Sequence, residues 1–145
     1  MRISAKGRYG LAAMTCLAHS YSNGAPVTII RISEELGISK IYLEQVFSLL
    51  KRARLVISLK GSQGGYQLSR RPGEITAYDI LSAIELGLLE VPDKAAEKMP
   101  VLDRALSARI YQPLDQAIHA SLSSVTLEDI LAAVDEENAA YMYFI

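Results

Sequence analysis

The sequence has 145 residues, half of them hydrophobic, which suits a single folded domain with its own core and argues against disorder. Its single cysteine, Cys16, excludes an intrachain disulfide and any four-cysteine zinc or iron–sulfur site within one chain. No apolar run is long enough for a membrane span, so we expect a cytoplasmic protein.

The net charge of −1 conceals two halves of opposite sign. Residues 1–73 carry 11 Lys and Arg against 3 acidic residues, whereas residues 74–145 carry 4 against 13. A basic region attracts polyanions because each neutralised phosphate releases counterions. We therefore expect the first half to face a polyanion and the second half to point away from it.

The chain is expected to begin with two helices. Apolar residues three to four apart predict a helix over residues 8–21, which Asn23 and Gly24 end. A second helix is expected over about 29–36, followed by a sharp turn at Gly37.

A third helix is expected after this turn, with Ser39 as its N-cap and its end near Arg52. Its apolar residues recur at the spacing of a core-facing stripe: Leu43, Val46, Phe47 and Leu50. A helix, a glycine turn and a helix with an exposed polar face form the pattern of a helix-turn-helix motif.

Segment 54–71 then has the pattern of a β-hairpin. Ile57 and Leu59 alternate with polar residues in the outgoing strand, as Tyr66 and Leu68 do in the returning strand, so we expect these four on its buried side. Its tip is rich in glycine, which lets a backbone approach a partner closely. Four cations surround this tip: Arg54, Lys60, Arg70 and Arg71. A hairpin in this place indicates the wing of a winged helix, a module that most often binds DNA.

The third helix is the candidate recognition helix. In a major groove, Lys40 could contact phosphate or guanine, Gln45 adenine, and Glu44 the amino group of cytosine. Lys60 of the wing suits a minor-groove or phosphate contact. Three N-terminal cations suit phosphate positioning: Arg2, Lys6 and Arg8. The alternative is that the polar face of the third helix is simply solvated and that Lys60 only increases solubility.

The acidic half is expected to be helical. Thr76 and Asp79 form a capping-box spacing that opens one helix, and Thr126 and Asp129 open a last helix to about Val134. Between them, a loop is expected over about 90–100, followed by a helix over about 101–122. Pro113 lies inside this helix, and we expect a kink there. The end of the chain, 139–145, is apolar and aromatic.

The helix over 101–122 is a candidate for dimerisation, because proteins that bind the major groove commonly pair to match two half-sites. Its stripe comprises Leu102, Leu106, Ile110, Leu114 and Ile118. The alternative is that this helix packs back on its own domain. Cys16 and His19 share a helix face, but two ligands do not hold a structural zinc, and no catalytic constellation is present. We expect neither a metal site nor an enzyme.

Three motifs resemble the family of winged-helix regulators that includes the iron–sulfur regulator IscR. They are the opening 1–10, the segment 38–45, and Lys60-Gly-x-x-Gly-Gly-Tyr-x-Leu68. The resemblance implies a bacterial homodimer that binds palindromic operators in double-stranded DNA. It also implies that Tyr42, Glu44 and Gln45 contact the operator, with Lys60 in place of the family's usual wing arginine.

The cluster-binding branch of this family carries three cysteines in a region that has none here, 88–100, so no iron–sulfur cofactor is expected. The acidic half resembles instead the cysteine-metabolism repressors of the CymR type. That resemblance implies a repressor of sulfur metabolism genes whose C-terminal residues, Tyr143, Phe144 and Ile145, dock into cysteine synthase (O-acetylserine sulfhydrylase). The alternative is that the tail packs on the dimer.

The expected fold is mainly α with a small β-hairpin: a winged helix-turn-helix over residues 1–73 and a helical dimerisation and partner region over 74–145. The predicted function is that of a dimeric repressor responding through cysteine synthase. One alternative is a redox or nitrosative regulator of the same family that uses a cluster or a thiol. A second is a winged-helix module that binds no DNA.

Overall fold

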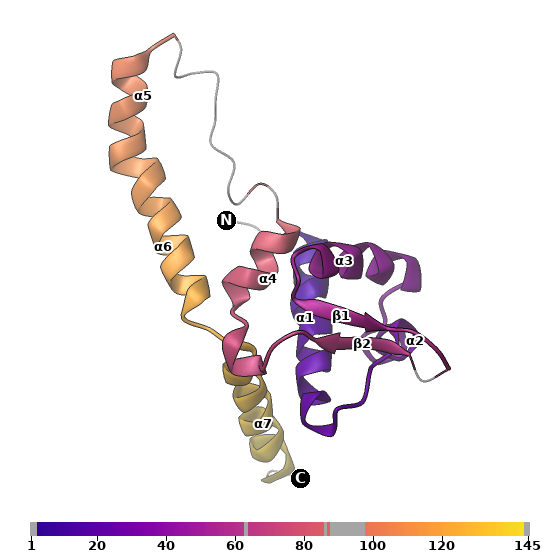
Figure 1. The fold of residues 1–145 in the computed structure, drawn as a ribbon. Coiled ribbons are helices and arrows are strands. Elements are labelled where there is room, and N and C mark those ends of the chain that lie inside the picture. Colours follow the sequence, from indigo (N-terminus) through magenta and orange to yellow (C-terminus); the bar gives the residue numbers. More distant parts are fainter. Residues whose placement is uncertain (1–2, 63, 86, 88–97, 144–145) are drawn as a thin grey trace.

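The computed structural model describes residues 3–62, 64–85, 87 and 98–143. Along the chain these residues form α1 (Ala5–His19), η1 (Tyr21–Asn23), α2 (Ile29–Leu36), α3 (Lys40–Arg52), β1 (Val56–Leu59), β2 (Gly65–Leu68), η2 (Pro72–Glu74), α4 (Ala77–Ile84), α5 (Pro100–Leu106), η4 (Ser107–Tyr111), α6 (Gln112–Ser123) and α7 (Leu127–Tyr143). Figure 1 shows α1–α4 and the hairpin gathered in one body, from which α5 and α6 project as a long arm. The order of helices and hairpin is that of a winged helix-turn-helix, which confirms the expected fold class.

The core lies between α1, α3 and α4. Met14 of α1 and the predicted stripe of α3 are fully buried, as are Ile75 and Ile80. Leu127 at the start of α7 is buried in the same cluster. The core therefore takes side chains from both the basic and the acidic half of the sequence.

Local signals set most helix ends. The first helix begins at Ala5 instead of residue 8, because the Ser4 hydroxyl accepts a hydrogen bond from the Gly7 N–H and caps it. Both predicted capping boxes are present, with Thr76 paired to Asp79 and Thr126 to Asp129.

The buried side of the hairpin differs from the prediction. Val56 is buried, whereas Ile57 and Leu59 are 45% and 41% exposed. The antiparallel register pairs Val56 with Leu68 and Ser58 with Tyr66, so Ile57 and Leu59 lie on the outer face. The prediction was wrong because Val56 and Ile57 are both apolar, so that alternation alone did not select the face.

The predicted helix over 101–122 is two α-helices joined by a π-helical segment, η4. The Gln112 N–H donates to the Ser107 carbonyl, five residues back, immediately before Pro113. Since proline has no N–H, a wide turn here accommodates the missing donor without ending the helix.

The last helix is longer than predicted. α7 continues past Val134 to Tyr143, because the intervening residues are mostly Ala, Glu and other residues that tolerate helix, with no Gly or Pro. In the ranges that the structure describes, no helix is long and apolar enough to cross a bilayer.

Candidate nucleic-acid interface

The turn between α2 and α3 is held by local hydrogen bonds. Gly37 adopts a left-handed backbone with φ of 66°, and its N–H donates to the Ser33 carbonyl at 2.9 Å. The Ser33 hydroxyl donates to the Ile38 carbonyl, and the Ser39 hydroxyl accepts from the Tyr42 N–H at 3.2 Å. These bonds set the direction in which α3 leaves the turn.

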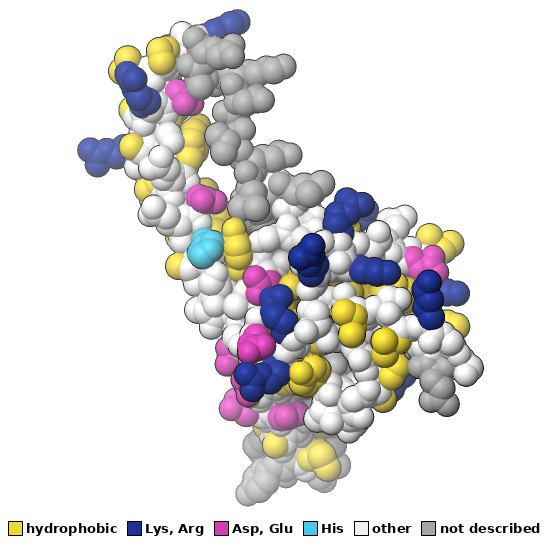
Figure 2. Space-filling view, viewed as in Figure 1, with side chains coloured by type: hydrophobic (Ala, Val, Ile, Leu, Met, Phe, Trp, Pro, Cys, Tyr) yellow, Lys and Arg dark blue, Asp and Glu magenta, His cyan; other side chains and the backbone are white. Residues whose placement is uncertain are grey.

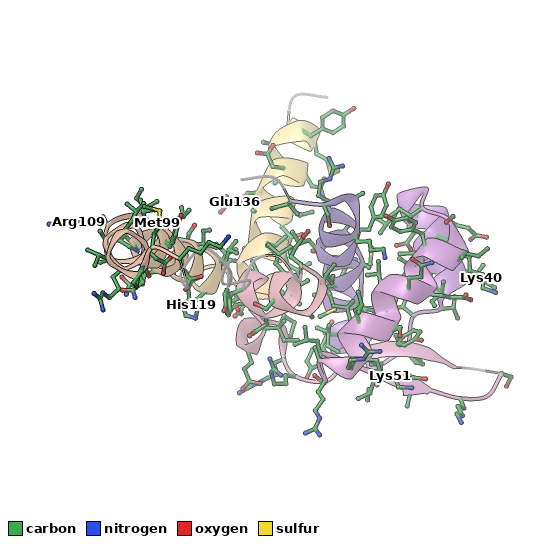
Figure 3. The ribbon with its side chains drawn as sticks, turned by 90° about the horizontal axis from the view of Figure 1, so that it is seen from above. Lys40, Lys51, Met99, Arg109, His119 and Glu136 are labelled. Atoms are coloured by element: carbon green, nitrogen blue, oxygen red, sulfur yellow. The ribbon has the colours of Figure 1, made fainter. Side chains whose placement is uncertain are left out.

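The first turns of α3 present a polar face. Lys40, Glu44 and Gln45 are exposed, and Ile41 is 72% exposed, whereas the opposite stripe is fully buried. Seen from above, Lys40 and the tip of the hairpin lie toward the same side of the molecule (Figure 3). The three polar residues predicted to contact bases therefore share one exposed helix face.

Tyr42 is placed differently from its neighbours. It is half-buried, and its ring meets the ring of Tyr9 edge to face, with centroids 5.2 Å apart. The Lys6 ammonium lies 6.0 Å from the centre of the Tyr42 ring. Tyr42 thus joins the recognition helix to the first turns of α1. Tyr9 was not predicted from the sequence, and no local pattern indicates it.

The hairpin is anchored to α3 and to the residues before α2. The ring of Tyr66 packs 4.4 Å from that of Phe47, which is fully buried in α3. Tyr66 and Val27 exchange two backbone hydrogen bonds of 2.8 and 2.9 Å. A side chain at Gly65 would place its Cβ 2.6 Å from the Val27 carbonyl, so glycine is required for this approach.

The tip of the hairpin leaves Lys60 exposed. Gly61 has φ of 109°, and its carbonyl accepts from the Gly64 N–H at 3.0 Å in a tight turn. A Cβ at Gly64 would lie 2.5 Å from the Leu59 carbonyl. The glycines thus have a structural role in the turn, whatever partner the tip contacts.

Two of the cations predicted around the tip are paired with acids at the base of the hairpin. Arg70 lies 3.5 Å from Asp79, and Arg71 lies 3.1 Å from Glu74. The hydrogen bond and charge of Arg71 lower the pKa of the Glu74 carboxyl. Both arginines therefore belong to the junction with α4 and not to the tip.

Charge is unevenly distributed over the surface. Figure 2 shows Lys and Arg side chains spread over the body, whereas many of the visible Asp and Glu side chains gather where the body meets α7. Arg8, Lys40, Lys51 and Lys60 are exposed, and Lys6 is half-buried beside Tyr42. A basic surface beside an exposed helix face is the electrostatic footprint of a DNA-binding protein.

The projecting arm, α5–η4–α6, contacts the body mainly through α6, which packs on α4. His119 of α6 packs against Tyr78 of α4, with ring centroids 4.2 Å apart. Above this contact, the arm exposes much of its predicted stripe: Leu102 is 47%, Ile110 51% and Leu114 57% exposed, while Leu106 and Ile118 are half-buried.

Several predicted residues lie at the ends of the chain, in the cysteine-free loop or on α1 outside the basic surface. Arg2, Phe144 and Ile145 lie outside the described residues, as does most of the cysteine-free loop, and Tyr143 is described only as the last residue of α7. Cys16 is half-buried in α1, and burial, together with the nearby Glu35 carboxylate, raises the pKa of its thiol. His19 is exposed at the end of the same helix.

The comparisons with known proteins agree on one family. A model of the Rrf2 family, described as an iron-dependent transcriptional regulator, matches residues 3–133. The chain is 39% identical to the transcriptional regulator CymR of Bacillus subtilis over the full length of both proteins. It is 37% identical to the regulator IscR of Xenorhabdus nematophila over 90% of this chain and 79% of that protein.

Solved structures support the same relationship. The structure of CymR, the global cysteine regulator of B. subtilis, matches with a TM-score of 0.71 and 34% identity, over 92% of this chain and 98% of that one. That of T. potens IscR matches with a TM-score of 0.74 and 34% identity, over 99% and 96%.

The donor set does not fit the iron in the family's description. The whole sequence offers one cysteine and two histidines, and the cysteine is half-buried with a raised pKa, which disfavours the thiolate that iron requires. Within the described ranges, no group of three or more His, Cys, Asp or Glu side chains is placed to hold a metal ion. An iron–sulfur cluster held by this chain's own cysteines is therefore not supported.

Proposed function

The chain belongs to the Rrf2 family of transcriptional regulators and is a DNA-binding regulator, not an enzyme; from that premise we propose that it is a dimeric repressor of genes for cysteine and sulfur metabolism. The observation that carries the DNA-binding part is the exposed polar face at the start of α3, held beside an anchored hairpin with Lys60 at its tip.

In this proposal α3 enters the major groove. Gln45 and Glu44 face base edges there, and Lys40 contacts phosphate or guanine. Lys60 contacts phosphate or the minor groove, as a lysine gives a point charge without the planar fork of arginine. Ser39 lies at the N-terminus of α3, where backbone N–H groups favour a phosphate. Lys6, Arg8 and Arg2 add phosphate contacts that position the protein.

Dimerisation is supported by the arm. Its exposed leucine and isoleucine side chains would be covered by a second copy, and the two recognition helices of such a pair would contact half-sites of a palindromic operator. Two half-sites one helical turn apart would lie about 34 Å from centre to centre.

The cysteine-related part rests on the full-length similarity to CymR, whose structure is described as that of a global cysteine regulator. We propose that the chain reports sulfur status through cysteine synthase, with Tyr143, Phe144 and Ile145 as the docking residues. A free carboxylate on an apolar side chain suits a pocket that binds an amino-acid substrate. Exposed Tyr141 and Met142, at 70% and 75%, support an accessible end of α7.

The DNA-binding proposal is tested by selecting bound fragments from genomic DNA and measuring affinity for a selected duplex. We expect Lys40→Ala to weaken binding and to reduce the slope of log affinity against log salt by about one. Lys98→Ala, an exposed lysine in the acidic half, is the matched control and should change neither. Equal effects of the two variants would contradict the assignment of α3.

The partner proposal has a separate test. Calorimetry should detect binding of the full chain to cysteine synthase and no binding after deletion of Ile145. The same affinity with and without Ile145 would contradict docking through the tail. Enrichment of fragments from genes unrelated to sulfur metabolism would contradict the assigned targets while leaving DNA binding intact.

A further inference from the structure

Glu85, at the C-terminal end of α4, is joined to the N-cap of α1. Its Oε1 accepts hydrogen bonds from the Ser4 N–H at 2.8 Å and from the Ser4 hydroxyl at 2.6 Å. The two residues are 81 positions apart in the sequence. The same hydroxyl accepts from the Gly7 N–H at 3.1 Å, so the residue that begins α1 is held by the residue that ends α4.

Two glycines near the start of α1 leave room for side chains from the end of α4. A Cβ at Gly7 would lie 2.2 Å from Glu85 Oε1, and a Cβ at Gly10 would lie 2.1 Å from the Cδ1 atom of Ile84. Both glycines are buried. The carboxylate also lies at the positive end of α1, where the helix dipole favours a negative charge. The start of α1 is therefore packed against side chains of α4 at its two glycines and held there by the Glu85 carboxylate.

The first turns of α1 continue this chain of contacts to the recognition helix. Tyr9 packs against Tyr42, and the Lys6 ammonium lies over the same ring. Tyr42 is in the first turn of α3, and its N–H is bonded to the Ser39 cap. Figure 1 shows the start of α1 between the end of α4 and α3.

We infer that Glu85 is a positioning residue for DNA binding: through Ser4 it holds the first turns of α1, with Lys6 and Tyr9, against the start of the recognition helix. This inference rests on the proposed binding of DNA through α3. It goes beyond the residues proposed to contact DNA: an acidic residue outside the basic half increases the affinity for DNA.

Removal of Glu85 is expected to change the affinity for DNA in the direction opposite to that expected from charge alone. An acidic side chain near a DNA-binding surface repels phosphate, so its removal should tighten binding if charge alone matters. If Glu85 positions Lys6 and Tyr42, its removal should weaken binding although the protein becomes less negative. The sign of the change therefore separates the two explanations.

The test uses the full-length protein and a duplex selected from genomic DNA, with affinity measured by fluorescence anisotropy over a range of salt. We expect Glu85→Ala to weaken binding by up to about tenfold, because the lost hydrogen bonds are internal to the chain and affect the duplex only through the positions of Lys6 and Tyr42. The salt slope should also fall as phosphate contacts are lost. Glu85→Gln keeps an acceptor oxygen and should retain most of the affinity. Glu34→Ala, an exposed acid of α2, is the control for charge and should bind slightly more tightly.

A double variant distinguishes a shared contact from two separate effects. Ser4→Ala should also weaken binding, and combining it with Glu85→Ala should add little further loss. Circular dichroism and thermal melting select variants that remain folded. If Glu85→Ala does not fold, Ser4→Ala decides the test, because unchanged affinity in that variant overturns the inference. Unchanged or tighter binding by Glu85→Ala, or a loss as large in Glu85→Gln, overturns the inference. Failure of the unaltered protein to bind any duplex would instead overturn the proposed function.

Discussion

Two regions of the molecule differ in how far they bury their apolar side chains. The reading unit comprises α2, α3 and the hairpin (residues 29–68). The arm comprises α5, η4 and α6 (residues 100–123). The reading unit buries its stripe within one chain, where Phe47, Leu43 and Leu50 are fully inaccessible. The arm leaves three side chains of its own stripe about half exposed. The reading unit thus has a buried core of its own, although Ile41, Ile57 and Leu59 remain exposed on its surface. Over residues 100–123 the arm has no buried residue, as expected for one side of the dimer that we propose.

The two regions should therefore respond differently to substitution. Changes inside the reading unit should act on the stability of the folded chain, whereas changes on the arm should act on the association of two chains. Substitutions in the arm and beneath the hairpin test this contrast directly and have the largest expected effects. Smaller effects are expected at Arg54, where α3 meets the hairpin, and at Cys16 of α1.

Placing charge on the arm should abolish dimers while the chain stays folded. Ile110→Glu combined with Leu114→Glu removes two apolar side chains from each copy, and each is worth about 1.5–3 kcal/mol when buried. We expect the dissociation constant to rise by at least about a thousandfold, measured by analytical ultracentrifugation. Ala120→Glu, an exposed residue on the other side of α6, is the control and should remain dimeric. A dimer that survives both arm substitutions would show that the interface lies elsewhere.

Removing the ring beneath the hairpin should destabilise the fold. Phe47→Ala loses a fully buried side chain and its packing against Tyr66, so the free energy of unfolding should fall by about 3–5 kcal/mol. Urea denaturation at fixed protein concentration measures this change. Ile57→Ala, on the exposed outer face of the same hairpin, should cost less than about 1 kcal/mol. Equal losses of unfolding free energy in the two variants would contradict the placement of Ile57 on the outer face of the hairpin.

The junction between α3 and the hairpin stores strain at Arg54. This residue has φ of 60°, a left-handed conformation that costs a side chain about 1–2 kcal/mol. Arg54→Gly should therefore raise the free energy of unfolding by about 1 kcal/mol. Arg52→Gly is the matched control. Arg52 is the last residue of α3 and has a helical backbone, so glycine relieves no strain there and should lower the free energy of unfolding by up to about 1 kcal/mol. Destabilisation by both variants would show that the Arg54 side chain stabilises the junction.

The smallest effect concerns the thiol and tests the redox alternative. Burial and the Glu35 carboxylate raise the pKa of Cys16, so less thiolate is present at neutral pH than in a free cysteine. Alkylation by iodoacetamide should be slow and should accelerate only at higher pH than usual. A Cys16→Ser, Ala120→Cys variant provides an exposed thiol for comparison. Reaction of Cys16 as fast as this control would support a thiol-based signal.

The sequence predicted much of the reading unit because the signals there are local. Ser39 caps a helix three residues away, Gly37 supplies a left-handed turn, and the stripe of α3 repeats with the helical period. The capping boxes at Thr76 and Thr126 are detectable for the same reason. Once the buried stripe of α3 is known, the residues on its opposite, exposed face are known as well.

Tertiary structure decided what local patterns leave open. Alternation could not choose between the faces of a strand that begins Val56-Ile57, and the packing of Tyr66 on Phe47 chose it. Sequence spacing also gave no sign of the contact between Ser4 and Glu85 or that between Tyr9 and Tyr42. The sequence by itself thus determined the elements and their caps, because those bonds join near neighbours. Only the folded chain decided which faces meet, because those contacts join residues that come together when the core closes.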